Sequence, residues 1–243
     1  MSVIEIQNVT KHFPHSAERM LLRGYLTRLL KGVRAQPFVA LRDVSFSVER
    51  GESLAIVGHN GAGKSTLLSL VAGVAQPTSG SVKVDGRIAA LLDLGSGFHP
   101  DLTGAENLLL NASLMGMNRK EAESKFEAIL EFSGLREFIR EPLRTYSTGM
   151  VMRLAFSVVM HTEPQIVILD EVLAVGDAEF QAKCRGALER MRNEGRTLLF
   201  VSHAAAEVRR MCDRAVWLDH GRLMMEGAAG EVIDAYEKRL LGG

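Results

Sequence analysis

The stretch GHNGAGKS, from Gly58 to Ser65, constrains the fold of this chain more than any other feature. It fits the pattern G-x-x-x-x-G-K-[ST] without a mismatch, and it follows the short apolar segment SLAIV, which is typical of a fully buried strand. Glycines let backbone N–H groups turn toward phosphate oxygens, and the helix that begins here adds its positive end. The predicted nucleotide contacts are Gly58, His59, Asn60, Gly61, Ala62, Gly63, Lys64, Ser65 and Thr66.

This phosphate loop assigns two specific roles. Lys64 supplies a full positive charge to the β- and γ-phosphates of a nucleotide, and the Ser65 hydroxyl is a ligand for Mg²⁺. Short buried strands return at QIVILDE and RTLLFVSH, each followed by a helical pattern. We therefore expect an α/β protein with a P-loop NTPase core and a mainly parallel sheet.

Two further segments extend this core. The opening residues, VIEIQNVT, and the later stretch ALRDVSFSVE both alternate apolar and polar side chains, which predicts an N-terminal antiparallel β layer. From about residue 101 to 160, apolar residues recur at helical spacing with few turn signals, which predicts a helical insert subdomain. The segment RAVWLDHGRLMMEG predicts a hairpin that turns at His220 and Gly221.

An acid pair follows one of the buried strands. Asp170 and Glu171 come directly after four apolar residues, at the carboxyl end of the predicted strand. By itself such a pair more often marks the start of a loop. Together with the phosphate loop, it predicts Asp170 as a Mg²⁺ ligand and Glu171 as the residue that orients or deprotonates the attacking water.

His203 also follows a strand, at the end of LLFVS. On the edge that holds phosphate, its ring N–H is able to contact a γ-phosphate, which makes it a second candidate catalytic residue. The alternative, a structural or solvated histidine, stays open from the chemistry alone.

Composition excludes several classes of protein. Lys plus Arg equals Asp plus Glu at 29 each, which argues against a protein that coats nucleic acid. The two cysteines lie far apart without metal-ligand spacing, which indicates a reducing compartment. The chain lacks a signal-peptide pattern and any run near about 18 uninterrupted apolar residues. A role at a membrane is therefore expected to come through a partner.

A second helix start, YSTGMVMRLAFSVVM, is also suited to negative charge. Ser147, Thr148 and Gly149 fit a helix cap and a tight turn before the apolar run. With the phosphate loop, this stretch, the acid pair and the histidine in this order, the chain resembles the ATP-binding subunit of an ABC transporter over nearly its whole length. YSTGM stands where that family usually has LSGGQ, with Thr148 replacing a glycine and Met150 a glutamine.

The resemblance implies a geometry for the second helix start. Family members form head-to-tail dimers in which each ATP lies between the phosphate loop of one copy and the signature helix of the other. Ser147, Thr148 and Gly149 are then predicted to meet the partner's nucleotide, while the same helix packs its apolar side chains inside. Asp177, in AVGD, occupies the place of the family's D-loop aspartate and is a further predicted nucleotide-site residue.

Two departures from the family pattern are evident. The family usually has a glutamine before the helical lobe, but this region reads LLDLGSGFHPDLTGAEN, where Asp93 or Leu94 lies nearest. Asp93 is the candidate metal-side replacement. An insert, PHSAERMLLRGYLTRLLKGVRAQPF, lengthens the first strand connection, and Phe13 before it is expected to stack on adenine.

The insert combines an apolar face with basic residues. One interpretation is a helix near anionic lipid or a partner's surface, and the other is a helix packed on its own domain with a solvated basic face. The pattern favours neither.

The same departures narrow the resemblance. LDLGSGFHPDLTGAEN, YSTGM and LDEVLAVGDAEF look like the ATPases that export lipid-linked polysaccharides across bacterial inner membranes. This implies an ATP hydrolase that uses ATP and Mg²⁺, a homodimer under an integral-membrane permease dimer, a peripheral position on the cytoplasmic face, and no nucleic-acid partner. Residues 1–243 are expected to form one ABC ATP-binding domain without a C-terminal carbohydrate-binding domain. An exporter of another lipid or drug, a soluble ATPase acting on nucleic acid or ribosomes, and a nucleotide-sensing regulator are the alternatives.

Overall fold

The buried strand β3 (Ser53–Val57) lies inside a six-stranded sheet with the order β5-β6-β7-β3-β8-β9. The computed structural model describes residues 1–14, 37–91, 97–170, 176–202 and 204–241. The other strands of this sheet are β5 (Ile88–Leu91), β6 (Ile166–Asp170), β7 (Thr197–Val201), β8 (Arg214–Asp219) and β9 (Arg222–Ala228). Neighbours from β5 to β8 run parallel, and only β9 is antiparallel, so the predicted parallel core is confirmed.

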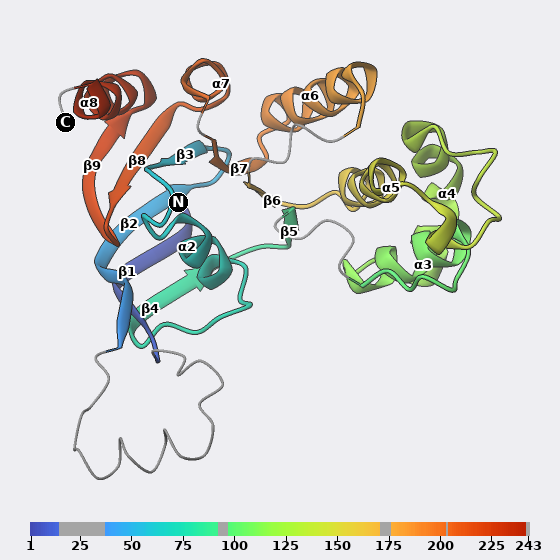
Figure 1. The fold of residues 1–243 in the computed structure, drawn as a ribbon, viewed down its shortest axis with the longest axis horizontal. Helices are drawn as coiled ribbons and strands as arrows, with labels where there is room; N and C mark the ends of the chain where they lie inside the picture. The colour runs from blue at the N-terminus through green and yellow to red at the C-terminus, as the bar shows by residue number, and fades with distance from the viewer. Residues whose placement is uncertain (15–36, 92–96, 171–175, 203, 242–243) are drawn as a thin grey trace, which may run out of the picture.

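A smaller antiparallel sheet forms the predicted N-terminal layer. Its order is β2-β1-β4, from β1 (Ser2–Phe13), β2 (Phe38–Glu49) and β4 (Ser79–Val84). Val44, Phe46 and Val48 on β2 are buried, while Ser45 and Ser47 face away from the core, as the alternating pattern predicts. Helix α2 (Lys64–Val71) packs with this sheet against one face of the larger sheet (Figure 1).

The strands on either side of Asp85 and Gly86 belong to different sheets. β4 pairs with β1, whereas β5 pairs in parallel with β6. The Arg87 amide donates to the Gln165 side-chain oxygen at 2.9 Å, which holds the start of β5 beside the start of β6. The turn at Asp85 and Gly86 therefore carries the chain from one sheet to the other.

Helices α6 (Ala178–Asn193), α7 (Ala205–Met211) and α8 (Ala229–Leu241) lie along the opposite face of the larger sheet (Figure 1). Alternation along β3 produces the two layers, because Leu54 and Ile56 face α2 while Ala55 and Val57 face the helices. β8 and β9 form the predicted hairpin, with positive φ at both His220 and Gly221. Within the described residues, none of these helices or the others has the length and apolar character that a membrane crossing requires.

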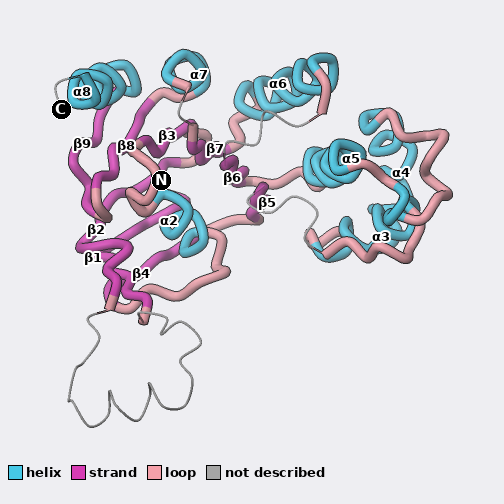
Figure 2. The backbone as a smooth tube through the Cα atoms, in the orientation of Figure 1, coloured by secondary structure: helices cyan, strands magenta, loops and turns pink. Residues whose placement is uncertain are grey.

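The remaining helices gather at one end of the molecule, as the tube in Figure 2 makes clear. They are α3 (Gly104–Leu114), α4 (Arg119–Ser133) and α5 (Thr148–His161), with a 3-10 turn at Leu143–Thr145. Thr103 and Glu106 form a reciprocal cap at the start of α3, and Asn118 caps α4. These helices have a hydrophobic core of their own, which includes Leu108, Ile129 and Leu154.

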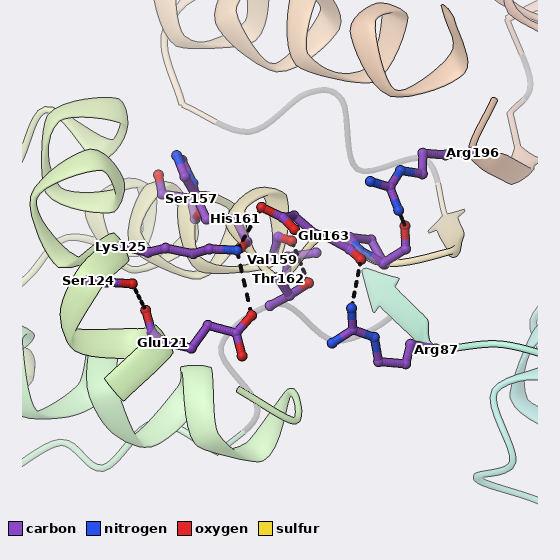
Figure 3. Close-up of polar contacts among 11 residues, drawn as sticks. Arg87, Glu121, Ser124, Lys125, Ser157, Val159, His161, Thr162, Glu163 and Arg196 are labelled. Atoms are coloured by element: carbon purple, nitrogen blue, oxygen red, sulfur yellow. Dashed lines mark hydrogen bonds and ion pairs between the residues drawn. The ribbon is translucent and has the colours of Figure 1, made fainter. Parts of the chain in front are cut away.

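A polar cluster joins this helical group to the sheet (Figure 3). Lys125 of α4 donates to the His161 carbonyl at 3.0 Å and to the Glu163 carboxylate at 2.8 Å. The hydrogen bond from Lys125 and its charge hold the pKa of Glu163 below its ordinary value. Arg87, next to β5, reaches the Glu163 carbonyl at 3.5 Å, so residues from both sides meet at this turn.

An aromatic cluster completes the same junction. Phe132 of α4, Phe156 of α5 and Phe180 of α6 lie with ring centroids 5.8–6.4 Å apart. Phe156 and Phe180 are each 1% exposed. Edge-to-face and stacked contacts of this kind stabilise beyond the area they bury.

Removing the Phe156 ring is expected to loosen this junction. Phe156→Ala leaves a cavity among three packed elements, so we expect the free energy of unfolding to fall by about 3–5 kcal/mol. The shift in urea midpoint, followed by circular dichroism, measures the change. Phe138→Ala, at a ring 46% exposed, is the matched control and is expected to change stability by less than about 1 kcal/mol. Equal midpoints for the two variants would contradict the assigned packing.

Candidate functional site

The phosphate loop connects β3 to α2, and its glycines are required by close packing. Gly58 has φ 150°, and a Cβ there would lie 2.2 Å from the Leu218 carbonyl oxygen. Gly63 has φ 106°, and a Cβ there would lie 2.7 Å from the Ala40 carbonyl oxygen. Only glycine fits both positions without displacing backbone, so the loop winds closely against β2 and β8.

Lys64 lies within the loop rather than in solvent. Its side chain is buried, and Nζ donates to the Gly58 carbonyl at 2.7 Å and to the His59 carbonyl at 3.1 Å. These carbonyls hold the ammonium group above the start of α2. A phosphate group that enters the loop offers the same ammonium a fully charged acceptor, which makes a stronger hydrogen bond than a carbonyl does.

The first turn of α2 is open to an anion. Its N-cap, Gly63, provides no side-chain hydrogen bond, and the turn contains no acidic residue. The N–H groups at the start of a helix and the helix dipole both favour negative charge. A cavity of about 320 Å³ lies at this end, lined by Phe38, Ala40, Asn60, Gly61, Gly63, Lys64, Ser65 and Thr66.

Phe38 lines this cavity, whereas the sequence predicted Phe13 as the aromatic residue of the site. Phe13 and Phe38 are register partners on β1 and β2, and they are 39% and 56% exposed. Phe13 is not among the cavity-lining residues, and its ring has the Lys11 ammonium 5.1 Å from its centroid. One feature of the sequence could have indicated Phe38. It is the first residue of β2, the strand that precedes β3 and the phosphate loop.

The carboxyl ends of β3, β6 and β7 lie at one edge of the sheet. Asp170 on β6 is in register with Val201 on β7, which is in register with Ile56 on β3, two residues before Gly58. β5 also ends at this edge, because Leu91 is in register with Leu169. The backbone of Asp170 therefore lies two strands from the strand that carries the phosphate loop.

Several predicted site residues lie outside the described part of the structure. Glu171, His203 and Asp93 are in the undescribed ranges, as are the Asp170 side chain and the insert at residues 15–36. Glu171 directly follows β6, and His203 follows β7 by two residues. Their roles stay predictions, and the described strands that precede them, β6 and β7, end at the edge of the sheet that holds the phosphate loop.

The second helix start, at Ser147, is formed by α5. The Ser147 side chain accepts a hydrogen bond from the Met150 amide at 3.2 Å, and Thr148 is exposed while Gly149 is partly exposed. The first turn of α5 also contains no acidic residue. Phe156, Val158 and Val159 of the same helix are buried, as predicted, so its apolar face packs inside while its start faces solvent.

Among the α-helices that the structure describes, α2 and α5 share this lack of negative charge. Each of the others has a glutamate in its first turn: Glu106, Glu121, Glu179, Glu207 and Glu231. A first-turn glutamate stabilises a helix start by neutralising the dipole. The two starts without one, α2 and α5, are the two at which the sequence analysis expects phosphate.

Asp177 has a local structural role. Its carboxylate accepts from the Phe180 amide at 2.8 Å and so caps α6, and it lies 3.5 Å from the Arg153 guanidinium of α5. Arg153 also donates to the Ser133 carbonyl of α4 at 2.9 Å. Arg153, which no sequence pattern indicated, therefore links the signature helix α5 to Asp177 at the start of α6.

The two cysteines are unsuited to nucleophilic or metal chemistry. Burial raises the pKa of Cys184 and of Cys212 to about 12, so both thiols stay protonated near neutral pH. Thiolate is the form that attacks substrates and binds metals. The chemistry of the site is therefore left to the phosphate loop and the strand ends.

Comparison with known proteins identifies the family. The family model for ABC transporters matches residues 41–174. The chain is 48% identical over 242 residues to the O-antigen export system ATP-binding protein RfbB of Klebsiella pneumoniae, with 98% of each chain covered. It is 36% identical over 238 residues to the teichoic acids export ATP-binding protein TagH of Listeria monocytogenes, with 96% of this chain and 71% of that protein covered.

The fold agrees with this. A dimeric ATP-binding cassette in a post-hydrolysis state bound to ADP and Pi superposes with a TM-score of 0.73 at 22% identity, with 93% of this chain and 98% of that chain covered. The fold and the site define an ATP-binding cassette. The chain belongs to the ABC transporter family and is an ATPase of that family, so the predicted family and fold class are confirmed.

Lys64→Ala is expected to weaken ATP binding by about 10- to 100-fold, since a hydrogen bond to a charged group contributes about 1.5–3 kcal/mol. Titration with a fluorescent ATP analogue measures the affinity. Lys83→Ala, which removes an exposed lysine from β4, is the matched control and is expected to bind as the native chain does. Unchanged affinity in Lys64→Ala would contradict the assignment of the phosphate loop.

Proposed function

We propose that this chain is the ATPase subunit that powers export of a lipid-linked polysaccharide across the bacterial inner membrane. It acts as a head-to-tail homodimer on the cytoplasmic face, beneath a dimeric membrane-spanning permease. The observation that supports the head-to-tail dimer is that α2 and α5 both begin without an acidic residue in the first turn. The class of exported substrate is inferred from the relatives, whose names specify export of O-antigen and teichoic acids.

The two helix starts belong to different parts of one chain. α2 lies between the two sheets, whereas α5 belongs to the helical group beyond β5 and β6 (Figure 1). In a head-to-tail pair, the α5 start of one copy meets the nucleotide held by the α2 start of the other. Each triphosphate then receives hydrogen bonds from two helix starts, and ATP binding stabilises the closed dimer.

Within each site, the residues have separate tasks. Lys64 moves from the carbonyls of Gly58 and His59 to the β- and γ-phosphates, and a partner's Ser147 and Gly149 contact the γ-phosphate from the far side. Ser65 and Asp170 would hold Mg²⁺, and Asp93 would be a further candidate ligand. When bound, Mg²⁺ neutralises part of the phosphate charge.

The remaining residues contact the attacking water, the γ-phosphate and the adenine base. Glu171 orients or deprotonates the attacking water, and His203 contacts the γ-phosphate. Phe38 lines the cavity, and Phe13, the predicted adenine contact, is its register partner on β1, so two aromatic residues are candidates for stacking on the base. Asp177 and Arg153 link the start of α6 to the signature helix α5.

Contact with the permease is assigned to the loop before α3 and to α3 itself. Leu110 and Leu114 lie one turn apart on α3 and are 37% and 62% exposed. Exposed apolar side chains at this spacing suit the apolar face of a partner helix. Closure of the dimer then moves this surface and drives the permease between its two states.

Glu171→Gln is expected to keep ATP binding and to stall hydrolysis, because the amide does not accept the proton of the attacking water. Light scattering after gel filtration with Mg²⁺ and ATP is then expected to give a stable dimer. Glu179→Gln, at an exposed first-turn glutamate of α6, is the control and is expected to turn over ATP normally. Hydrolysis at the native rate in Glu171→Gln would mean that another residue orients or deprotonates the attacking water.

The same variant tests the exported substrate. Cells that carry Glu171→Gln are expected to lose surface polysaccharide and to accumulate the lipid-linked polymer inside. Fractionation followed by glycan blotting measures both pools. A normal amount of surface polysaccharide, together with reduced export of another lipid or drug, would be consistent with the ATPase assignment but would contradict polysaccharide as the exported substrate.

Mixing two inactive variants distinguishes pairing between copies from pairing within one copy. Lys64→Ala removes the phosphate-loop charge, and Ser147→Arg obstructs the α5 start. In a head-to-tail heterodimer one of the two sites has neither defect, so a 1:1 mixture is expected to recover up to about a quarter of the native ATPase rate. Each variant alone is expected to be inactive. A mixture as inactive as its components would exclude the head-to-tail arrangement.

A further inference from the structure

Two histidines and an aspartate meet where the phosphate loop contacts the β8–β9 hairpin. His59 follows Gly58 in the loop, Asp219 is the last residue of β8, and His220 is in the hairpin turn. One ligand atom from each lies within 4.8 Å of the others. We propose that His59, Asp219 and His220 bind a Zn²⁺ ion that fastens the hairpin turn to the phosphate loop.

The hydrogen bonding of His59 fixes which ring nitrogen is free to bind. Nδ1 lies 2.6 Å from the Asn60 carbonyl oxygen, and a carbonyl only accepts, so Nδ1 carries the proton. In the neutral ring, Nε2 is then a bare lone pair. That lone pair lies 2.9 Å from the Asp219 carboxylate, which is also an acceptor. Two acceptors at this distance require a cation that both can share.

A proton is poorly placed to be that cation. Nε2 has almost no solvent-accessible surface and makes no hydrogen bond within the described residues, because the carboxylate lies off the direction in which an N–H would point. A metal ion does not need this alignment, since it sits farther from the nitrogen than a hydrogen does and is bound by each ligand along its own direction. The off-line contact therefore favours a metal over a salt bridge.

The spacing also suits zinc. Ligand atoms around tetrahedral Zn²⁺ lie roughly 3.3 Å apart, since Zn–N and Zn–O distances are about 2.0–2.1 Å. The Asp219 carboxylate is 2.9 Å from His59 Nε2 and 3.9 Å from His220 Nε2, which brackets that value. The His220 side chain is 82% exposed, so it is able to close on the ion and leave the fourth position to water.

The backbone holds the three ligands together. A Cβ on Gly58 would meet the Leu218 carbonyl, so the loop and β8 are in direct contact, and the Gly221 amide donates to the Ala62 carbonyl at 3.0 Å. His220 has φ 45°, a left-handed conformation that is uncommon for residues other than glycine but is enriched in asparagine, aspartate and histidine. That conformation places the His220 ring beside the His59 ring, with ring centroids 4.8 Å apart.

A metal at this position acts on the part of the loop that Lys64 uses. The His59 carbonyl accepts from both Lys64 Nζ and the Ala62 amide. A metal bound to the His59 ring therefore restricts the backbone from which Lys64 must detach to reach phosphate. The site is separate from the Mg²⁺ that accompanies the nucleotide, because two of its three ligands are imidazoles, which Zn²⁺ prefers and Mg²⁺ does not.

Metal titration of the nucleotide-free chain tests the proposal. Co²⁺, which replaces Zn²⁺ in tetrahedral sites and absorbs visible light there, is titrated first, and Zn²⁺ is then used to displace it. The native chain is expected to bind about one equivalent. His220→Asn is expected to weaken binding at least about tenfold, since it removes one ligand from the site. Asparagine tolerates the left-handed conformation and the position is exposed, so the variant is expected to fold normally.

His161→Gln is the matched control, because it removes a histidine from α5 in the helical group. It is expected to bind Co²⁺ and Zn²⁺ as the native chain does. Two outcomes overturn the proposal. One is no saturable binding by the native chain, and the other is equal affinity in the native chain and His220→Asn. Either result would mean that a proton, and not a metal, lies between His59 and Asp219.

Discussion

The helix start at α2 is the constraint on which the rest of the site depends. Its first turn has no capping side chain and no acidic residue, so its N–H groups and the Lys64 ammonium are directed at one small volume. The fold is arranged to support that volume. β3 leads into it, β2 and β8 pack against its glycines, and β6 and β7 end at the same edge. A triphosphate satisfies this concentration of positive charge, which water does less well.

The start of α5 also lacks a first-turn acidic residue, and the helical group holds this helix in position. α5 is held in place by the aromatic cluster of Phe132, Phe156 and Phe180, and its own Arg153 donates a hydrogen bond to the Ser133 carbonyl of α4. Its start is left to solvent, capped by Ser147 alone. A rigid helix with an open start is a ready partner for phosphate that another copy presents, since a helix held by packing loses little freedom on binding.

The phosphate loop is also attached to the hairpin at the far edge of the sheet. The Gly221 amide bonds to Ala62, and His59 lies against Asp219. The β8–β9 hairpin is therefore part of the scaffold of the nucleotide site. This contact explains how a bound metal at the hairpin and a bound nucleotide would act on one short backbone segment.

The sequence by itself determined the phosphate loop, the parallel core and the helical group, because each depends on neighbouring residues or on a short periodic pattern. It also indicated the α5 start, since capping is local. The tertiary structure decided which strands are neighbours, that β4 and β5 separate into different sheets, and that Phe38 rather than Phe13 lines the cavity. It also brought His59 to Asp219 and His220. Such contacts join residues distant in the chain, and packing between layers selects them, which no local pattern specifies.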